Sequence, residues 1–280
     1  MQPFSEINSV ALLSRQEFEN TCRKFTRNAY LGEHISICKV LTKYKMYVDT
    51  RDLGIVPHLI MDGFWESWLT QCLADKVKPG FVCMDIGANL GYYSLLMSEL
   101  CGPTGRTVAV EPNPAMVKLM RFSEFVHSWN FDIVDKAITD KAGEAVLTIP
   151  NGSFGGASLA SPGIPFSGSS KVRVATTTVD QVVIDLRLQK VDMIKMDVEG
   201  FEPLVFEGMR ETIAMNPQLQ IIMEYSPFSY KEAEKFSEFL FENFVVYRIK
   251  DVDNTELLDA ASMRKMLNLK DHTDLYLVKK

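Results

Sequence analysis

Short apolar runs alternate with helix-length amphipathic stretches from residue 80 to the end of the chain. This alternation is typical of repeated βαβ units, whose strands form a mainly parallel sheet with helices on both faces. Turn signals such as Pro79-Gly80 and Asn216-Pro217 mark where several runs begin. The pattern predicts an α/β, Rossmann-like fold with seven strands, at residues 81–85, 106–110, 131–138, 192–197, 219–225, 244–249 and 274–278.

An insertion separates the third and fourth predicted strands. Residues 144–149 and 172–178 have strand-like patterns, and the segment between them, 151–170, is rich in Gly and Ser. This composition disfavours regular structure, so the segment is expected to run over the surface as a loop. It is either a floppy connector or a lid that orders over a bound substrate.

Residues 1–78 precede the alternating pattern and are interpreted as an N-terminal extension to a domain that spans residues 79–280. Apolar and aromatic side chains recur at helical spacing over residues 61–74, which predicts a helix packed on the core. We interpret Trp65 and Trp68 as core residues rather than as a sugar-stacking platform. The extension is expected to lie near the mouth of a ligand site.

Composition narrows the classes of function. The 280 residues are 46% hydrophobic, with a formal charge of -6 and a pI near 5.4. Binding to a phosphate backbone relies on clustered Lys and Arg, so nucleic acid is not expected as a partner. The five cysteines form no C-x-x-C pair, which argues against a disulfide framework or a zinc site. Without a signal-like or membrane-length apolar stretch, the protein is expected to be cytoplasmic and not inserted in a membrane.

The most informative motif joins the first predicted strand to a helix at residues 92–100. It reads Asp85-Ile-Gly87-Ala-Asn89-Leu-Gly91. Glycines allow a tight turn and close approach of a ligand, and the N-terminus of the following helix offers free N–H groups to a carboxylate. Asp85, at the carboxyl end of its strand, is placed to meet an ammonium group. An amino-acid zwitterion presents both groups.

The spacing of this motif distinguishes two kinds of nucleotide ligand. Dinucleotide enzymes use G-x-G-x-x-G to admit a pyrophosphate, whereas Asn89 replaces the second glycine here. Glu111 ends the second strand, where its carboxylate can accept hydrogen bonds from both ribose hydroxyls. The two motifs together favour an adenosine ligand whose other end is an amino acid. Asp135 and Ala137, on the third strand, are expected at the adenine edge, although Asp135 is equally consistent with a solvated side chain.

These motifs resemble those of the FkbM-type methyltransferases, which have the class I methyltransferase fold. The resemblance covers about residues 80 to 225. It rests on the glycine motif, on Glu111-Pro-Asn-Pro114, on Ala137-Ile-Thr-Asp140 followed by Gly143, and on Ile194-Lys-Met-Asp-Val-Glu-Gly200 with Glu202.

The resemblance implies that the cofactor is S-adenosylmethionine and that a methyl group is transferred to a hydroxyl oxygen of a sugar, polyketide or other secondary metabolite. It also implies that Asp197 lies beside the transferred methyl. A further similarity at residues 52–66 implies that Glu66 contributes to the substrate site.

Two carboxylates follow the fourth predicted strand, where open α/β sheets bind their ligands. Asp197 and Glu199 are the candidate catalytic residues, since neighbouring carboxylates raise each other's pKa and so become better bases for a hydroxyl proton. They are also the candidate ligands if a divalent cation takes part. Lys195 is expected to point away from Asp197 because side chains alternate along a strand. Glu199 is alternatively an acid at the start of the helix near residue 201.

Two further residues are candidates for the acceptor site. Glu224 ends the fifth strand at the same edge of the sheet, although a lone acid there is often structural. Of the four histidines, only His58 is placed near the expected mouth. The favoured function is an O-methyltransferase acting on a small molecule or carbohydrate. The alternatives are a nicotinamide-dependent oxidoreductase and a catalytically silent binding protein with the same fold, and the sequence does not determine an oligomeric state.

Overall fold

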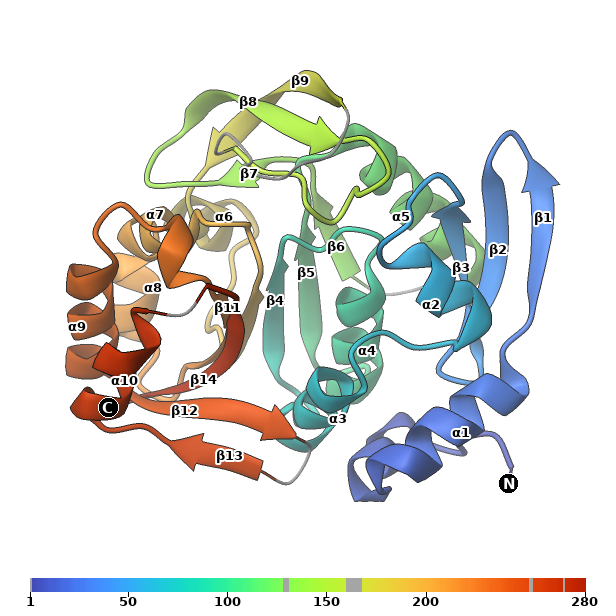
Figure 1. Cartoon of the computed structure of the whole chain (residues 1–280), viewed down its shortest axis with the longest axis horizontal. Helices are drawn as coiled ribbons and strands as arrows, with labels where there is room; N and C mark the ends of the chain where they lie inside the picture. Colours follow the sequence, from blue (N-terminus) through green and yellow to red (C-terminus); the bar gives the residue numbers. More distant parts are fainter. Residues whose placement is uncertain (1, 128–130, 160–167, 252–253, 269) are drawn as a thin grey trace.

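The computed structural model describes residues 2–127, 131–159, 168–251, 254–268 and 270–280. Its centre is a mixed sheet of eight strands in the order β13-β12-β14-β11-β10-β4-β5-β6 (Figure 1). Five adjacent strands are parallel: β6 (Phe131–Val134), β5 (Arg106–Val110), β4 (Val82–Ile86), β10 (Met193–Met196) and β11 (Gln220–Tyr225). The other three pair antiparallel: β14 (Thr273–Lys279), β12 (Phe244–Asp251) and β13 (Asn254–Leu257).

The predicted α/β fold is confirmed, with two differences in the strands. The sequence analysis missed the edge strand β13, so the sheet has eight strands instead of seven. The predicted strand at 131–138 is wrong as one element, because β6 ends at Val134 and β7 (Ala137–Ile138) pairs with β9 in another sheet. Two charged residues, Asp135 and Lys136, interrupt the apolar run at this point.

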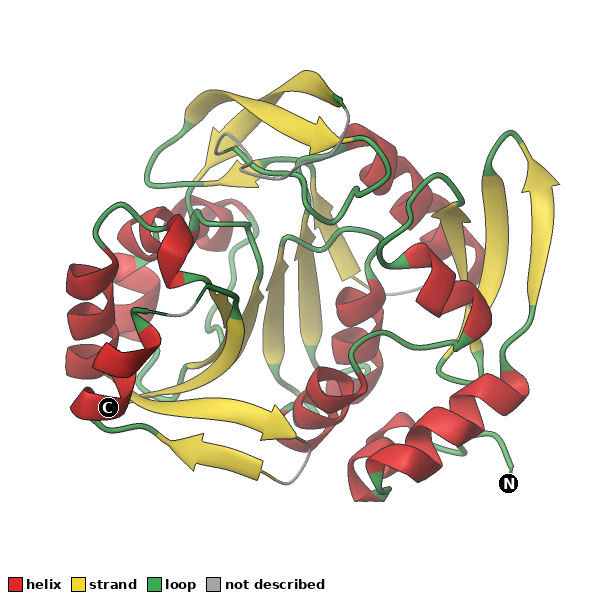
Figure 2. Cartoon of the chain, viewed as in Figure 1, coloured by secondary structure: helices red, strands yellow, loops and turns green. Residues whose placement is uncertain are grey.

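Helices cover both faces of the central sheet (Figure 2). Neighbouring residues of one strand point to opposite faces, so Cys83 packs in one core cluster and Met84 in the other. The cluster of Cys83 includes residues of α3 (Ser67–Lys76), α4 (Tyr92–Cys101) and α5 (Pro114–His127). The cluster of Met84 includes residues of α6 (Val179–Asp185), α7 (Glu202–Glu207), α8 (Arg210–Met215), α9 (Ala233–Asn243) and α10 (Ala260–Met266). The described helices include none that is both long and apolar enough to cross a bilayer.

Besides α3, the N-terminal extension adds a small antiparallel sheet and three more short helices. The sheet lies against α5, where Ser123 Oγ accepts a hydrogen bond of 2.9 Å from the backbone N–H of Tyr47. The elements are η1 (Ile7–Leu12), α1 (Arg15–Phe25), β1 (Asn28–Gly32), β2 (Ile35–Val40), β3 (Tyr44–Asp49) and α2 (Val56–Met61).

The predicted helix at 61–74 is wrong in its first part. Helix α2 ends at Met61 and α3 begins only at Ser67. Gly63 has φ +78°, and a Cβ atom there would lie 2.9 Å from Thr26 Cβ, so the chain turns at a position that only glycine fits. Glu66, with φ +35°, completes the break. The turn, rather than a helix face, therefore carries Glu66.

The insertion forms a three-stranded sheet above the carboxyl ends of the parallel strands (Figure 1). Strands β8 (Gly143–Pro150) and β9 (Ser169–Thr177) pair antiparallel, and β7 joins β9. Of the predicted loop at 151–170, residues 160–167 lie outside the described residues. Its first part folds back on β8, because Thr148 and Ser158 form a β-bridge.

Candidate functional site

The carboxyl ends of β4, β5, β10 and β11 surround a cavity of about 300 Å³. The glycine turn and the ends of β5 and β10 line its floor, as the topology of an open parallel sheet predicts. The insertion and the N-terminal extension line it from other sides. The lining residues used below are Ile55, Trp65, Glu66, Gly87, Asn89, Tyr93, Glu111, Ala137, Phe154, Gly155, Lys195, Asp197, Glu199, Glu224 and His272.

Gly87 brings the glycine turn into direct contact with the segment after β10. Its φ is +82°, and a Cβ atom at this position would lie 1.8 Å from the carbonyl oxygen of Asp197. The backbone N–H of Asp197 in turn donates a 2.9 Å hydrogen bond to Ile86 O. No side chain fits between the two segments, so glycine is required here by the backbone that passes over it.

Asn89 and Gly91 have different roles in the same turn. Asn89 has φ +50° and lines the cavity, and its buried Oδ1 has no hydrogen-bond partner among the described residues. Gly91, the N-cap of α4, packs against Met120 instead, since a Cβ there would lie 2.9 Å from Met120 Cγ. A buried acceptor without a donor is costly, so Asn89 Oδ1 marks a place where a ligand can donate.

Glu111 is buried at the end of β5 with its carboxylate at the cavity. Oε2 accepts from the backbone N–H of Asn89 at 2.8 Å, and Oε1 accepts from the N–H of Asn113 at 2.7 Å. Burial raises the pKa of Glu111 to about 7. Each oxygen of a carboxylate accepts more than one hydrogen bond, so both remain able to accept from a ligand hydroxyl.

Asp85 and Asp135 lie outside the cavity lining, whereas Ala137 belongs to it. Asp85 is fully buried, and Ser94 Oγ donates to its Oδ2 at 2.6 Å. Its Oδ1 has no hydrogen-bond partner in the described part of the chain, and burial raises its pKa. Asp135 is exposed, at the point where the chain leaves β6. The structure therefore groups Ala137, but not Asp135, with the glycine turn.

Lys195 points toward Asp197, so the expectation that it points away was wrong. The two residues are two positions apart, and alternation places such residues on the same side of a strand. Lys195 Nζ lies 3.2 Å from Asp197 Oδ2 and 5.0 Å from the centre of the Tyr93 ring. Burial acts to lower the pKa of Lys195, but Asp197 and Asp85 raise it on balance. A buried cation thus neutralises the predicted catalytic carboxylate.

Glu199 and Glu202 divide the roles that the sequence analysis left open. Glu202 begins α7, and its two carboxylate oxygens accept from the N–H groups of Val198 and Gly200, both at 3.1 Å. Glu202, in the first turn of α7, is therefore the acid that stabilises the turn before this helix. Glu199 instead lines the cavity with φ +53°. Burial, with help from Asp197 and Glu224, raises the pKa of Glu199 to about 9.

Glu224 faces the same cavity from the end of β11. Its Oε1 accepts from Ser226 Oγ at 2.8 Å, and its Oε2 lies 3.9 Å from His272 Nε2. Burial, followed by the charge of Asp197, raises the pKa of Glu224 to about 7. Burial acts to lower the pKa of His272, but the neighbouring carboxylates of Glu224 and Asp271 raise it on balance. Two titrating groups thus lie side by side at this wall.

Glu66 reaches the cavity from the N-terminal extension. Tyr93 OH donates to Glu66 Oε2 at 2.7 Å, and burial, with the charge of Asp274, raises the pKa of Glu66 to about 7. Trp68 Nε1 donates to Asp274 Oδ2 at 2.9 Å, so Trp68 is a partner of a buried acid. Trp65 lines the cavity. The two tryptophans therefore have different surroundings.

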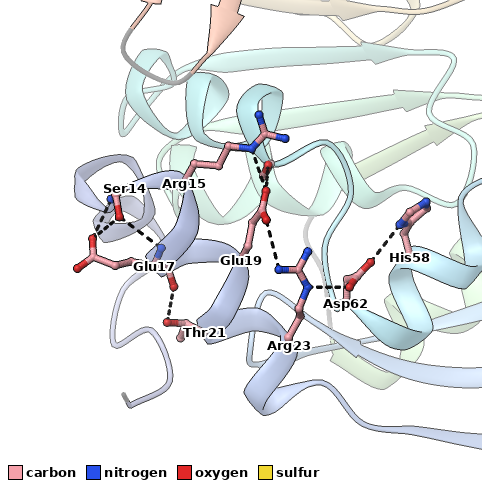
Figure 3. Close-up of polar contacts among 9 residues, drawn as sticks. Ser14, Arg15, Glu17, Glu19, Thr21, Arg23, His58 and Asp62 are labelled. Carbon is pink, nitrogen blue, oxygen red and sulfur yellow. Dashed lines mark hydrogen bonds and ion pairs between the residues drawn. The ribbon is translucent and has the colours of Figure 1, made fainter.

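His58 lies outside the cavity, in a chain of charged side chains that joins α1 and α2 (Figure 3). Its Nδ1 is 3.0 Å from Asp62 Oδ2, and Arg23 links Asp62 to Glu19. Its ring centre lies 5.3 Å from that of Trp65, and its side chain is 56% exposed. The structure therefore brings His58 to the outer side of Trp65 and not to the acidic cluster.

Several residues of the cavity were not predicted from the sequence. Tyr93 had only its place in α4 as a signal, and His272 had none, because it precedes an antiparallel strand far along the chain. For Lys195 the sequence did contain a signal. It lies two residues before Asp197, and side chains at this spacing point to the same side of a strand. The structure thus adds Lys195, His272 and Tyr93 to the predicted carboxylates.

Asp197 and Glu199, the predicted metal ligands, do not belong to a group of three or more metal-binding side chains among the described residues. Over the residues that the structure describes, no three His, Cys, Asp or Glu side chains are arranged to hold a metal ion. Asp197 is paired with Lys195, and Glu199 lies beside it on the cavity wall.

Comparison with known proteins identifies one family. The model of the methyltransferase FkbM domain matches residues 85–249, which is more than half of the chain. This segment contains the glycine turn, Glu111, Asp197 and Glu224. No curated protein sequence matches the chain.

Solved methyltransferase structures give distant matches. An rRNA methylase from Streptococcus thermophilus is 7% identical, with a TM-score of 0.43 over 76% of this chain and 93% of that one. The C-terminal domain of precorrin-6Y C5,15-methyltransferase from Rhodobacter capsulatus is 12% identical, with a TM-score of 0.44 over 78% and 91%. A SAM-dependent methyltransferase from Aquifex aeolicus is 12% identical, with a TM-score of 0.41 over 76% and 89%.

Proposed function

The chain belongs to the FkbM methyltransferase family, and we propose that this S-adenosylmethionine-dependent enzyme methylates a hydroxyl oxygen of a small molecule or carbohydrate. The observation that carries the proposal is the group of carboxylates on one cavity wall, Asp197, Glu199 and Glu224. An alcohol becomes a good nucleophile only when it loses its proton, and carboxylates with raised pKa values are suited to accept it.

The residues on the other side of the cavity fit the cofactor. Glu111 has lone pairs for two ribose hydroxyls, and Asn89 Oδ1 is a buried acceptor that lacks a donor among the described residues. We assign the glycine turn from Gly87 to Asn89 to the methionine end and Ala137 to the adenine side. When bound, the cofactor supplies an electrophilic methyl group on a sulfonium.

The roles of the carboxylates follow from their surroundings. Lys195 Nζ donates a hydrogen bond to Asp197 Oδ2, and Asp197 is assigned to orient the acceptor hydroxyl by accepting its hydrogen bond. Glu224, with a pKa raised to about 7, is assigned to take the proton, whereas Glu199, with a pKa raised to about 9, holds a proton at neutral pH and is assigned to donate a hydrogen bond to the acceptor. Glu66 lines the cavity on the side of the N-terminal extension and is assigned to the acceptor.

The charge of the cavity supports an acceptor without phosphate near the reacting hydroxyl. Beside the Lys195–Asp197 pair, the cavity is lined by the acidic side chains of Glu66 and Glu224, whose pKa values of about 7 leave them partly charged at neutral pH; Lys136 lines the cavity as well. A phosphodiester would be repelled there, whereas hydroxyl groups donate to such oxygens. This supports a small molecule or a sugar over a nucleic acid as the acceptor.

The test is methyl transfer from radiolabelled S-adenosylmethionine to a panel of sugars, phenols and polyols, with RNA and amines as competing acceptors. We expect labelled methyl ethers, which survive alkali, from at least one hydroxyl compound. Labelling of RNA or an amine alone would overturn the proposed acceptor. Binding of S-adenosylhomocysteine without any turnover would favour the silent binding protein.

A further inference from the structure

Residues 152–158 of the insertion form the part of the cavity wall that lies over the glycine turn. A Cβ atom on Gly155 would lie 3.4 Å from Asn89 Nδ2 and 3.2 Å from Ile55 Cδ1. The loop therefore rests directly on the cofactor turn on one side and on the N-terminal extension on the other.

Asp52 ties this loop to the N-terminal extension. It is 3% exposed, and its Oδ1 accepts from the backbone N–H groups of Gly54, Ile55 and Val56 at the start of α2. Its Oδ2 accepts at 2.7 Å from the N–H of Phe154, 102 residues along the chain. One carboxylate therefore shapes the turn before α2 and also holds the loop, through hydrogen bonds that its charge strengthens.

Three more contacts fix the loop around Asp52. Leu53 N–H donates to Gly152 O at 2.8 Å, and the guanidinium of Arg51 lies 5.9 Å from the centre of the Phe154 ring. At the far end, Ser158 Oγ donates at 2.9 Å to the carbonyl oxygen of Glu199. The loop is thus held between the N-terminal extension and the segment that carries the catalytic carboxylates.

We propose that Asp52 is a positioning residue that holds the loop at 152–158 closed over the cofactor cavity, and that this contact sets how long the cofactor stays bound. The proposal rests on the assignment of this cavity to S-adenosylmethionine. It does not depend on which acceptor is methylated.

The test compares Asp52→Asn with a matched variant, Asp180→Asn. Asp180 also accepts from backbone N–H groups at the start of a helix, those of Glu211 and Thr212, but it lies outside the cavity lining. Asn at position 52 keeps one acceptor oxygen for α2 and presents a donor to the Phe154 N–H. We expect S-adenosylhomocysteine to dissociate about tenfold faster from Asp52→Asn, measured by stopped-flow fluorescence, because a charge-assisted bond is lost. Asp180→Asn should leave the rate unchanged.

Two further measurements keep the proposal open to refutation. Hydrogen exchange of residues 152–158 in the wild type should slow when S-adenosylhomocysteine binds, a readout that needs no variant. Ser158→Ala, which removes the bond to Glu199, should also speed dissociation, whereas Ser237→Ala on α9 should not. Equal dissociation rates in wild type and a folded Asp52→Asn, or unchanged exchange in the loop, would overturn the proposal. A wild type that fails to bind S-adenosylhomocysteine would instead refute the cofactor assignment.

Discussion

Lys195 Nζ lies 3.2 Å from Asp197 Oδ2, in a part of the protein where Lys195 itself is only 5% exposed. The same ammonium is close enough to Asp85 and Glu66 for their charges to raise its pKa. A buried cation with several carboxylate neighbours compensates charges that would otherwise repel one another. Lys195 therefore lies among acidic residues from β4, from the segment after β10 and from the N-terminal extension.

Replacing Lys195 by Met should be strongly destabilising. The change leaves the fully buried Asp85 and the 37% exposed Asp197 without the charge of Lys195, and removing the partner of a buried charge costs up to about 3–5 kcal/mol. Lys190→Met provides the control, because its pair with Asp192 is half-exposed and should contribute less than about 1 kcal/mol. Urea unfolding of both variants measures the difference. Equal losses in the two variants would mean that Lys195 is not the main counter-ion of this cluster.

Asp197→Asn should lower turnover by roughly a hundredfold while leaving cofactor affinity nearly unchanged, because it removes the charge that orients the acceptor hydroxyl. Single-turnover kinetics report the chemical step, and calorimetry with S-adenosylhomocysteine provides the internal control. Near-normal turnover in a folded variant would remove Asp197 from the reaction and leave Glu199 and Glu224 as the candidates.

Glu111→Ala should weaken binding of S-adenosylhomocysteine tenfold or more, because two charge-assisted hydrogen bonds to the ribose are lost. Glu99→Ala is the control, since Glu99 accepts from Tyr44 OH and lies outside the cavity lining. Calorimetry at equal protein concentration compares the two. Unchanged affinity in Glu111→Ala would exclude the ribose contact.

Gly87→Ala should disrupt the site far more than Gly102→Ala, although both glycines have positive φ. At Gly87 the new Cβ would lie 1.8 Å from Asp197 O, whereas at Gly102 no described atom lies within 4 Å. Overpacking of this kind costs about 1–3 kcal/mol or more, and it separates the glycine turn from the catalytic segment. Thermal unfolding and binding of S-adenosylhomocysteine test this. Similar behaviour of the two variants would show that strain from φ, and not the clash, decides the outcome.

The carboxylate cluster should make the cofactor-free protein less stable as the pH rises. In the folded state the pKa of Glu224 is raised to about 7 and that of Glu199 to about 9, so the folded protein holds protons that the unfolded chain has released. Their contribution is present in full below the ordinary carboxyl pKa and is lost as the pH rises through these values. Glu199→Gln should therefore lose less melting temperature than the wild type between pH 6 and about pH 9. Parallel curves in differential scanning calorimetry would contradict this.

The sequence by itself determined most of the central sheet and the edge of the sheet at which the predicted site residues gather. The alternation of short apolar runs with helix-length amphipathic stretches predicts the parallel strands. A buried strand is recognisable because its apolar residues are neighbours in the sequence. The carboxyl ends of parallel strands meet at one edge, so Gly87, Glu111, Asp197 and Glu224 were expected in one region, and all four line the cavity.

Only the tertiary structure decided which segments cover the cavity and which side chains balance its charges. Three contacts join positions far apart in the chain: the close approach of Gly63 to Thr26 at the break before Glu66, the approach of His272 to Glu224, and the bond from Phe154 to Asp52. Such contacts depend on how separate elements pack, and no local periodicity records them. At Asp135 the local pattern was misleading. The apolar run around it predicted one strand over residues 131–138, but the chain leaves the central sheet here and Ala137 pairs with β9 in another sheet.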